Sequence, residues 1–406
     1  MKKIMIILFI VLALAADLKV TIFPYIHWIA WLILILPLII NGIFKRGIKV
    51  SPMLGIVFLL IFIGMISSFF INTNLENGVQ ILKVFLIAVT IYYFIYYSDI
   101  GWKEANIAIN IILIINVILL LLGILGLSVF SSLMTSDGRW GTFMAYPGSL
   151  VKIGAIGFYF NFMAFMVRKE KKNKIIHFIL LLSSLFVVYM DGSRTGMLVL
   201  LLTFIVAYLF YFLINYRNKL KVIIIPIIAI VISIPIILIN LPYLLKSRIA
   251  TSVINLISSN NISSGLELVD SSRFMMIKSA INKIYSSPFI GSGAFTTVGV
   301  YEDGTSMVVH NTYLQFWGDF GLFGIIGLLF LYFAWICFLP KMAYFIQLNK
   351  YIKGNILVTF SVLMLFYYIL NGFFHPYSTE LSEWITFIIP LTYCYNFYRG
   401  YFQKEE

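Results

Sequence analysis

Three arginines and one histidine occupy the few polar segments of a long apolar chain. Arg139, Arg194 and Arg273 belong to three separate segments, and His310 begins a fourth. A guanidinium group is planar, stays charged at any working pH and fits the oxygens of a phosphate. An imidazole, with an ordinary pKa of about 6.5, suits a general base near neutrality. Together these residue types predict a site that binds a diphosphate and takes a proton from a hydroxyl group. That combination is sufficient for glycosyl transfer from a lipid diphosphate without a metal ion.

Each of these side chains also has a structural interpretation. Arg139 could stack on the indole of the next residue, and Arg273 could serve as a helix cap or a surface charge. His310 could make a structural hydrogen bond. Lys246 and Arg248 follow a predicted span closely, where basic side chains commonly extend to lipid headgroups. The sequence leaves both interpretations open.

A second group of polar residues lies beside the first. Further candidates for substrate binding are Ser193, Asn311, Tyr313, Lys246, Arg248 and His375. Asp137 and Asp191 are interpreted as turn formers or as partners of the neighbouring arginines. Lys83, Lys152 and Asp319 fall within predicted spans, where a charge is costly if it faces lipid, so we expect them to face a cavity.

The positioning elements follow from composition. Hydrophobic residues make up 61% of the 406 residues and charged residues only 11%, against about 25% charged in soluble domains. Such a chain has too little polar surface to face water, so its solvent must be lipid. Cys337 and Cys394 both fall in apolar runs and have no disulfide or metal-ligand spacing. The composition predicts one all-α polytopic membrane domain over residues 1–406.

A membrane-spanning helix needs about 20 apolar residues. The sequence predicts twelve spans, at 4–21, 23–41, 51–71, 79–97, 106–129, 150–167, 174–190, 196–214, 222–244, 313–339, 355–373 and 382–398.

The basic residues set the orientation of these spans. Nineteen of the 29 lie in the termini and alternate connections, and eight lie in the other connections. The positive-inside rule places the first set, and with it both termini, in the cytoplasm. The net charge of +13 is then mainly an orientation signal, and without a basic patch interleaved with aromatics it does not predict nucleic-acid binding.

Residues 245–312 form the largest predicted extracytoplasmic loop. Phe274, Ile277, Ile281 and Tyr285 recur within it at helical spacing, and Pro288 ends the pattern. We expect this amphipathic helix to lie on the outer membrane surface, to cover a cavity and to carry part of the active site.

The polar motifs resemble those of the O-antigen ligase and polymerase superfamily. The resemblance covers residues 135–335 and rests on Gly138-Arg-Trp-Gly-Thr142, Ser193-Arg-Thr-Gly196, Arg273, Pro288-Phe-Ile-Gly-Ser-Gly293, His310-Asn-x-Tyr-Leu and Gly318-Asp-x-Gly321-x-x-Gly324. The chain departs from the family at Ile277, where an aromatic residue is frequent. We expect this departure to affect packing more than chemistry.

The resemblance implies a bundle of the glycosyltransferase-C type in the bacterial cytoplasmic membrane, with its active site outside. It implies that a glycan moves from undecaprenyl diphosphate to an acceptor hydroxyl, with inversion and without metal or nucleotide. By the same resemblance His310 is the base, and Arg139, Arg194 and Arg273 hold the diphosphate.

Three functions stay open at this stage. The first is a polymerase of O-antigen or capsule repeat units, favoured slightly because the bias toward Ile, Phe, Tyr, Asn and Lys suggests an AT-rich genome. The second is an O-antigen ligase that transfers finished glycan to a lipid or protein acceptor. The third is a flippase for lipid-linked oligosaccharide, which would need functional charges within the spans. Besides the lipid-linked substrate and membrane lipids, the expected partners are a chain-length regulator and a flippase of the same pathway.

Overall fold

The structure is a computed structural model that describes residues 2–15, 26–49, 52–97, 102–127, 134–135, 138–167, 170–215, 271–300, 306–338 and 352–402. These residues form twelve α-helices, one 3-10 helix and one two-stranded antiparallel sheet. Six helices are long and apolar enough to cross a membrane, and four shorter ones are also apolar. The protein is therefore a polytopic α-helical membrane protein. The expected total of twelve spans stays a prediction.

The elements in chain order are α1 (Lys2–Leu14), α3 (Ile26–Arg46), α4 (Pro52–Ile71), α5 (Leu75–Tyr96), α6 (Trp102–Ile124), α8 (Leu150–Val167), α9 (Lys171–Asp191), α10 (Arg194–Asn215), α15 (Ser271–Ser286), β1 (Val298–Val300), β2 (Ser306–Val308), α16 (Thr312–Phe333), the 3-10 helix (Ala334–Phe338), α18 (Ile352–Asn371) and α19 (Leu381–Phe402). Eleven of the twelve predicted apolar runs coincide with a described helix. The run at 222–244 lies outside the described residues.

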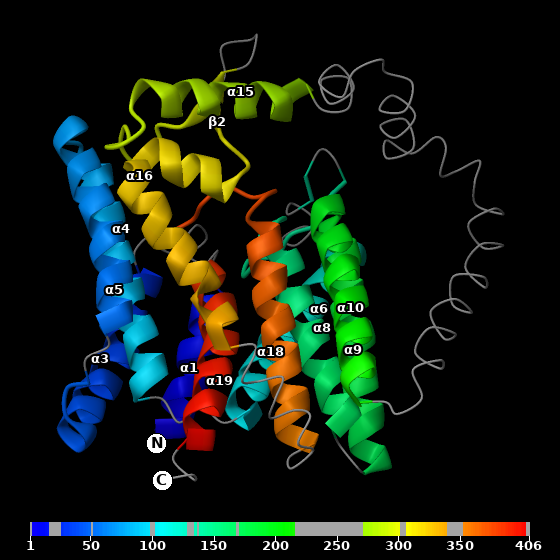
Figure 1. Ribbon diagram of the computed structural model, residues 1–406. Helices are drawn as coiled ribbons and strands as arrows, with labels where there is room; N and C mark the ends of the chain where they lie inside the picture. The colour runs from blue at the N-terminus through cyan, green and yellow to red at the C-terminus, as the bar shows by residue number, and fades with distance from the viewer. Residues whose placement is uncertain are drawn as a thin grey trace.

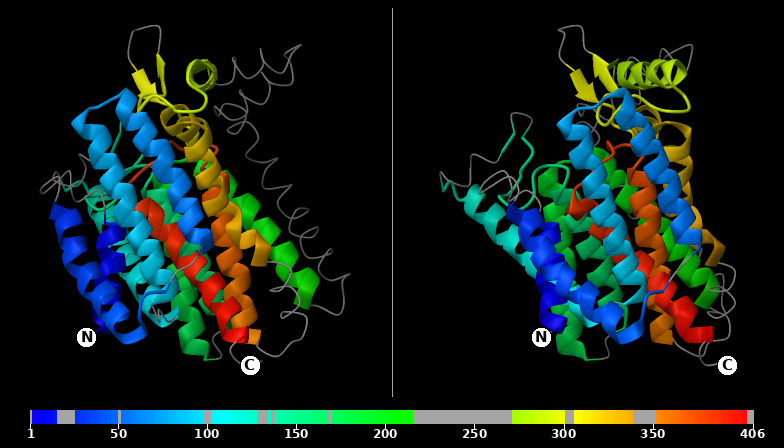
Figure 2. Two further views of the ribbon diagram at one scale, coloured as in Figure 1. Left: turned by 60° about the vertical axis from the view of Figure 1, so that its left-hand side comes forward. Right: turned by 90° about the vertical axis from the view of Figure 1, so that its left-hand side faces the viewer.

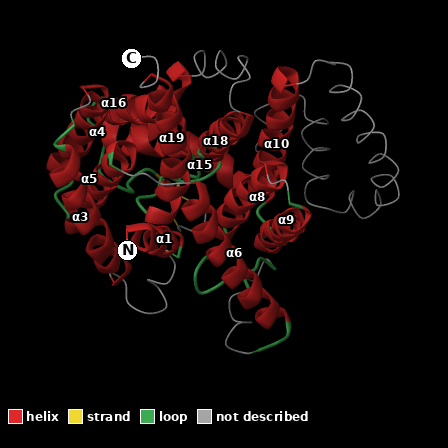
Figure 3. Cartoon of the chain, turned by 90° about the horizontal axis from the view of Figure 1, so that it is seen from below, coloured by secondary structure: helices red, strands yellow, loops and turns green. Residues whose placement is uncertain are grey.

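The long helices form a bundle, and α15 lies across one end of it (Figure 1). The hairpin of β1 and β2 stands beside α15 at this same end, which we call the loop end (Figure 2). Both chain termini lie at the opposite end (Figures 1 and 2). Seen along the bundle, α3, α4 and α5 lie on one side and α6, α8 and α9 on the other, with α19 between the two groups (Figure 3).

Aromatic side chains fill the centre of the bundle. Tyr332 on α16, Tyr368 on α18 and Phe387 on α19 meet there with ring centroids 5.0 to 5.4 Å apart. Trp384 lies edge-on against the last of these rings. Offset and edge-on contacts of this kind add to the stability from burial alone, so the helices that surround the loop end are held by a rigid core.

Glycines allow α4 and α16 to pack closely. A Cβ atom on Gly64 would collide with the backbone of Phe320 and Gly324. Small residues at such positions let two helix backbones approach each other. The glycines of α4 and α16 therefore allow these two helices to lie in close contact.

Helix α15 ends before Pro288, as predicted, and one of its apolar faces packs on the protein. Met276, Ala280 and Ile284 pack against β1 and the start of α16, whereas Ile277 is 41% exposed. Both faces of the helix are apolar, and the hairpin, which the sequence did not predict, covers only one of them. The stripe that defined the helix in the sequence therefore faces away from the protein.

Candidate functional site

Arg139 is paired with a buried aspartate at the start of the site. Its Nε atom donates to the backbone carbonyl of Asp191 at 2.9 Å, and its Nη2 atom donates to the Asp191 carboxylate at 2.8 Å. The same carboxylate accepts the amide hydrogens of Gly148 and Val151. Asp191 is fully buried, so it fixes the segment of Arg139 onto the beginning of α8. The sequence predicted a neighbouring arginine as the partner of Asp191, whereas the structure pairs it with Arg139, 52 residues away in the chain.

This pairing also brings two of the candidate segments together. The amide of Trp140 donates to the carbonyl of Met190 at 3.0 Å, next to the turn from which Arg194 begins α10. Ser193 acts within this turn as a helix cap, because its hydroxyl accepts the amide hydrogen of Gly196 at 3.2 Å. The side chain of Arg194 itself is outside what the structure describes.

His310 is half-buried in the short link between β2 and α16. Just before it, the amide of Val309 donates to the carbonyl of Thr297 at 3.2 Å. Just after it, the Asn311 side chain accepts the amide hydrogens of Tyr313 and Leu314. Asn311 is thus the cap of α16, which explains this residue without a substrate. A sequence signal existed, since Asn directly before an apolar helical run is a typical cap.

Asp319 anchors the loop to the bundle instead of facing a cavity as expected. Its carboxylate accepts the amide hydrogens of Phe295 and Thr297 at 2.8 and 2.9 Å and the Thr297 hydroxyl at 2.7 Å. The Gln315 side chain donates to it at 3.4 Å. Because Thr297 also receives the amide of Val309, Asp319 fixes the strand that leads to His310.

A kink in α16 at Gly321 allows the segment 288–293 to pack against this helix. Gly321 has a φ of 68°, and the amides of Ser292 and Leu322 close the gap by donating to Gly318 and Phe289. A left-handed conformation here favours glycine. The glycines of the 288–293 and 318–324 motifs therefore serve the docking of the loop on α16.

The segment 372–375 is hydrogen-bonded to Thr312, two residues after His310. Thr312 donates through its amide to Gly372 at 2.8 Å and through its hydroxyl to the carbonyl of His375 at 2.9 Å. The Tyr313 hydroxyl donates to a carbonyl of α18 at 2.9 Å, which gives this candidate residue a packing role. His375, a candidate on its own loop, lies beside the segment that carries His310.

The two lysines within spans are paired with glutamates at the start of α19. Lys83 lies 3.3 Å from Glu380, and Lys152 contacts Glu383. Lys152 also lines a small cavity with tyrosines of α18, as expected. Neither glutamate was among the candidate residues in the sequence. The signal was that an intramembrane lysine needs an acidic partner.

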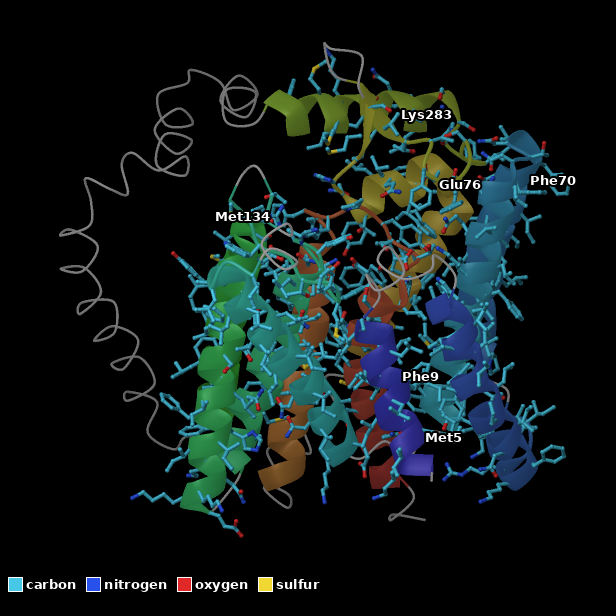
Figure 4. The ribbon with its side chains drawn as sticks, turned by 180° about the vertical axis from the view of Figure 1, so that it is seen from behind. Met5, Phe9, Phe70, Glu76, Met134 and Lys283 are labelled. Carbon is cyan, nitrogen blue, oxygen red and sulfur yellow. The ribbon has the colours of Figure 1, made fainter. Side chains whose placement is uncertain are left out.

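The candidate segments share the loop end. Met134, which pairs with Trp140 in an isolated bridge, and Lys283 on α15 both lie there, whereas Met5 lies toward the other end (Figure 4). Arg273 lies in the first turn of α15, but the structure does not describe its side chain. The described residues do not include Asp137, Lys246 and Arg248. The convergence of three arginines on one diphosphate therefore stays a prediction. The metal independence of the reaction also stays a prediction, although the described residues contain no group of three metal-ligating side chains.

Comparison with known protein families identifies this part of the chain. The family model described as O-antigen ligase (Wzy_C) matches residues 178–329, from α9 through the loop and hairpin into α16. No curated protein matches the chain. Residues 178–329 are therefore similar to the O-antigen ligase family, whose enzymes carry out ligase- or polymerase-type transfer of lipid-linked glycans.

Proposed function

We propose, from the similarity of residues 178–329 to the O-antigen ligase family, that the protein polymerises oligosaccharide repeat units carried on undecaprenyl diphosphate. The product is an O-antigen or capsular polysaccharide, made at the outer face of the bacterial cytoplasmic membrane. The observation that carries the proposal is the anchoring of His310, whose neighbours are fixed by Thr297 on one side and by Gly372 and His375 on the other. A base must be held in this way to meet its substrate.

In this mechanism His310 takes the proton of the acceptor hydroxyl. The acceptor oxygen attacks the anomeric carbon of the donor from the face opposite the diphosphate. The new glycosidic bond forms as the bond to the diphosphate oxygen breaks, so the configuration inverts. The diphosphate leaves with the electron pair, and the proton passes from the histidine to solvent.

The arginines stabilise the leaving group, because preorganised cations favour charge that develops in the transition state. Arg139 offers its Nη1 edge, since Nε and Nη2 are bonded to Asp191 and Nη1 has no partner among the described residues. Its side chain is 33% exposed. Arg194 and Arg273 complete the proposed diphosphate site from the starts of α10 and α15.

The family description favours a second candidate, an O-antigen ligase that transfers finished glycan to another acceptor. The same base and arginines would serve it, with a different acceptor. A flippase is less well supported, because Lys83 and Lys152, the two lysines within described helices that it would use, are neutralised by Glu380 and Glu383.

Complementation of a null strain tests the proposal. His310→Ala and Arg273→Ala are compared with the wild type by gel analysis of surface and lipid-linked glycan. We expect His310→Ala to lower chain formation by at least about 100-fold, the usual contribution of a general base, while single lipid-linked repeats accumulate. His177→Asn is the matched control, because His177 pairs through Nδ1 with Asn161 within the bundle and the amide nitrogen of asparagine takes the place of Nδ1.

The outcomes separate the candidates. Single repeats on undecaprenyl diphosphate support the polymerase. Long chains that stay on the lipid and never reach their acceptor point to the ligase. Full complementation by both variants would overturn the site and return attention to transport.

A further inference from the structure

A small polar pocket is lined by residues of α16, α18 and α19 and by the segment 372–378. Its lining includes Thr312, Asn371, His375, Tyr377, Ser378 and Glu383. The pocket has a volume of about 10 Å³, which is room for one water-sized group. A single hydroxyl group can therefore enter its interior, whereas a sugar ring cannot.

Asn371 leaves a hydrogen bond unmade in this pocket. The residue is only 5% exposed, and its Oδ1 atom accepts no hydrogen bond from any described residue. A buried acceptor without a donor is destabilising, and such groups in native proteins usually face a ligand or an ordered water. The atom therefore indicates an occupant that donates a hydrogen bond.

Glu383 adds a charged acceptor to the same lining. Lys152 neutralises its carboxylate from the deeper side, and a carboxylate paired in this way keeps further lone pairs for other donors. Burial, and then the nearby Asp319 carboxylate, raise the pKa of the Tyr377 phenol, so that hydroxyl stays protonated. Acceptors beside a protonated phenol suit an occupant that both donates and accepts, as a hydroxyl group does.

The pocket is joined rigidly to the proposed base. Thr312 lines it and is only two residues from His310. The amide and hydroxyl of Thr312 hold Gly372 and His375 at 2.8 and 2.9 Å, so the wall of the pocket and the histidine link move together. A sugar that presents one hydroxyl to the base has neighbouring hydroxyls available for a second contact.

We propose that this pocket binds one hydroxyl group of the acceptor sugar, with Asn371 and Glu383 as the residues that recognise it. This inference rests on the proposed polymerase function and assigns the acceptor side of the same site. Water offers the same donor chemistry as a sugar hydroxyl. The experiment therefore has to separate an acceptor contact from a structural water.

The probe is the free repeat unit, released by mild acid from the lipid-linked material of the null strain. It is added as acceptor to membranes that contain the full-length protein and the lipid-linked donor. The initial rate of its incorporation is measured over a range of concentrations for the wild type, Asn371→Ala and Asn371→Leu. Tyr367→Phe is the matched control, because Tyr367 has a buried hydroxyl without a described partner but lines the neighbouring cavity.

We expect both Asn371 variants to raise the half-saturating concentration of the free repeat unit by about 5- to 30-fold, the factor that one lost hydrogen bond to a buried group gives. The maximal rate and the behaviour of Tyr367→Phe should match the wild type. Asn371→Ala removes the acceptor without adding bulk, so it remains informative if the leucine variant does not fold. An unchanged half-saturating concentration in Asn371→Ala would mean that the pocket holds water only, and would overturn the inference. Incorporation by His310→Ala at saturating probe would instead overturn the proposed function, whatever the Asn371 variants do.

Discussion

Two buried aspartates, Asp191 and Asp319, hold the loop end together, and their carboxylates are satisfied in different ways. Asp191 accepts two backbone amides and the charged guanidinium of Arg139. Asp319 accepts the hydrogens of two backbone amides, two hydroxyls and a side-chain amide, all of them neutral groups among the described residues. One aspartate therefore engages a cation of the proposed site, and the other shapes the loop without engaging any.

Asp191 and Asp319 are both aspartates in apolar surroundings, but they have different roles in the folded protein. Asp319 acts through the position of Thr297 and Val309, so it affects His310 only by holding its strand. Asp191 fixes the orientation of Arg139 and leaves one guanidinium edge exposed, so it influences both fold and charge. Substitutions at the two sites should accordingly separate stability from binding.

The largest effect is expected for Asp319→Ala. The substitution removes the acceptor of five donors in a buried place, at a cost of about 3 kcal/mol or more. The unfolding midpoint in detergent should fall, cleavage at the hairpin of β1 and β2 by a protease should accelerate, and glycan transfer should be lost. Asp319→Asn, which keeps one acceptor oxygen, should give an intermediate result. An alanine variant with a normal midpoint and a protected hairpin would show that the loop is held by other contacts.

The double variant Arg139→Gln with Asp191→Asn should lose less stability than Asp319→Ala. Its main effect should be on glycan transfer. Removing both charges avoids an unpaired buried carboxylate, and the asparagine oxygen can still accept the amides of Gly148 and Val151. We expect the double variant to fold with a loss of about 1 kcal/mol. Its transfer rate should nevertheless fall by about tenfold or more, because the diphosphate loses a cation.

Melting temperature and glycan yield of the double variant are measured together. A normal yield would reduce Arg139 to a structural partner of Asp191. A low yield with a normal melting temperature would support the proposed contact with the diphosphate.

The sequence predicted those features that depend on long local patterns. The helices at eleven of the predicted apolar runs, and the end of α15 before Pro288, follow from runs of apolar residues and from the missing amide of proline. The strands β1 and β2 have three residues each, which is too short for an alternating pattern to be recognised. The buried face of α15 could not be chosen either, because both faces are apolar and only the hairpin decides which one is covered.

Contacts between segments that are distant in the chain could not be predicted from the sequence either, because no local pattern records them. Lys152 and Glu383 are 231 residues apart, and nothing local links them. The three candidate arginines and His310 could be chosen by residue type and spacing. In the folded protein, however, Asp191 positions Arg139, and Asp319 positions the strand that leads to His310. Pattern therefore predicts the chemistry of the site, while its geometry depends on tertiary packing.

The smallest effect is expected for Asn311, which follows His310 directly and was a candidate for substrate binding. As the cap of α16 it accepts two amide hydrogens, and its loss in Asn311→Ala should cost about 1 kcal/mol. Serine is also a good cap but has a shorter side chain and no amide. Asn311→Ser should therefore restore the melting temperature and, if capping is the whole role, the glycan yield as well. A serine variant with restored stability but short chains would show that the Asn311 side chain, like the histidine beside it, contacts the substrate.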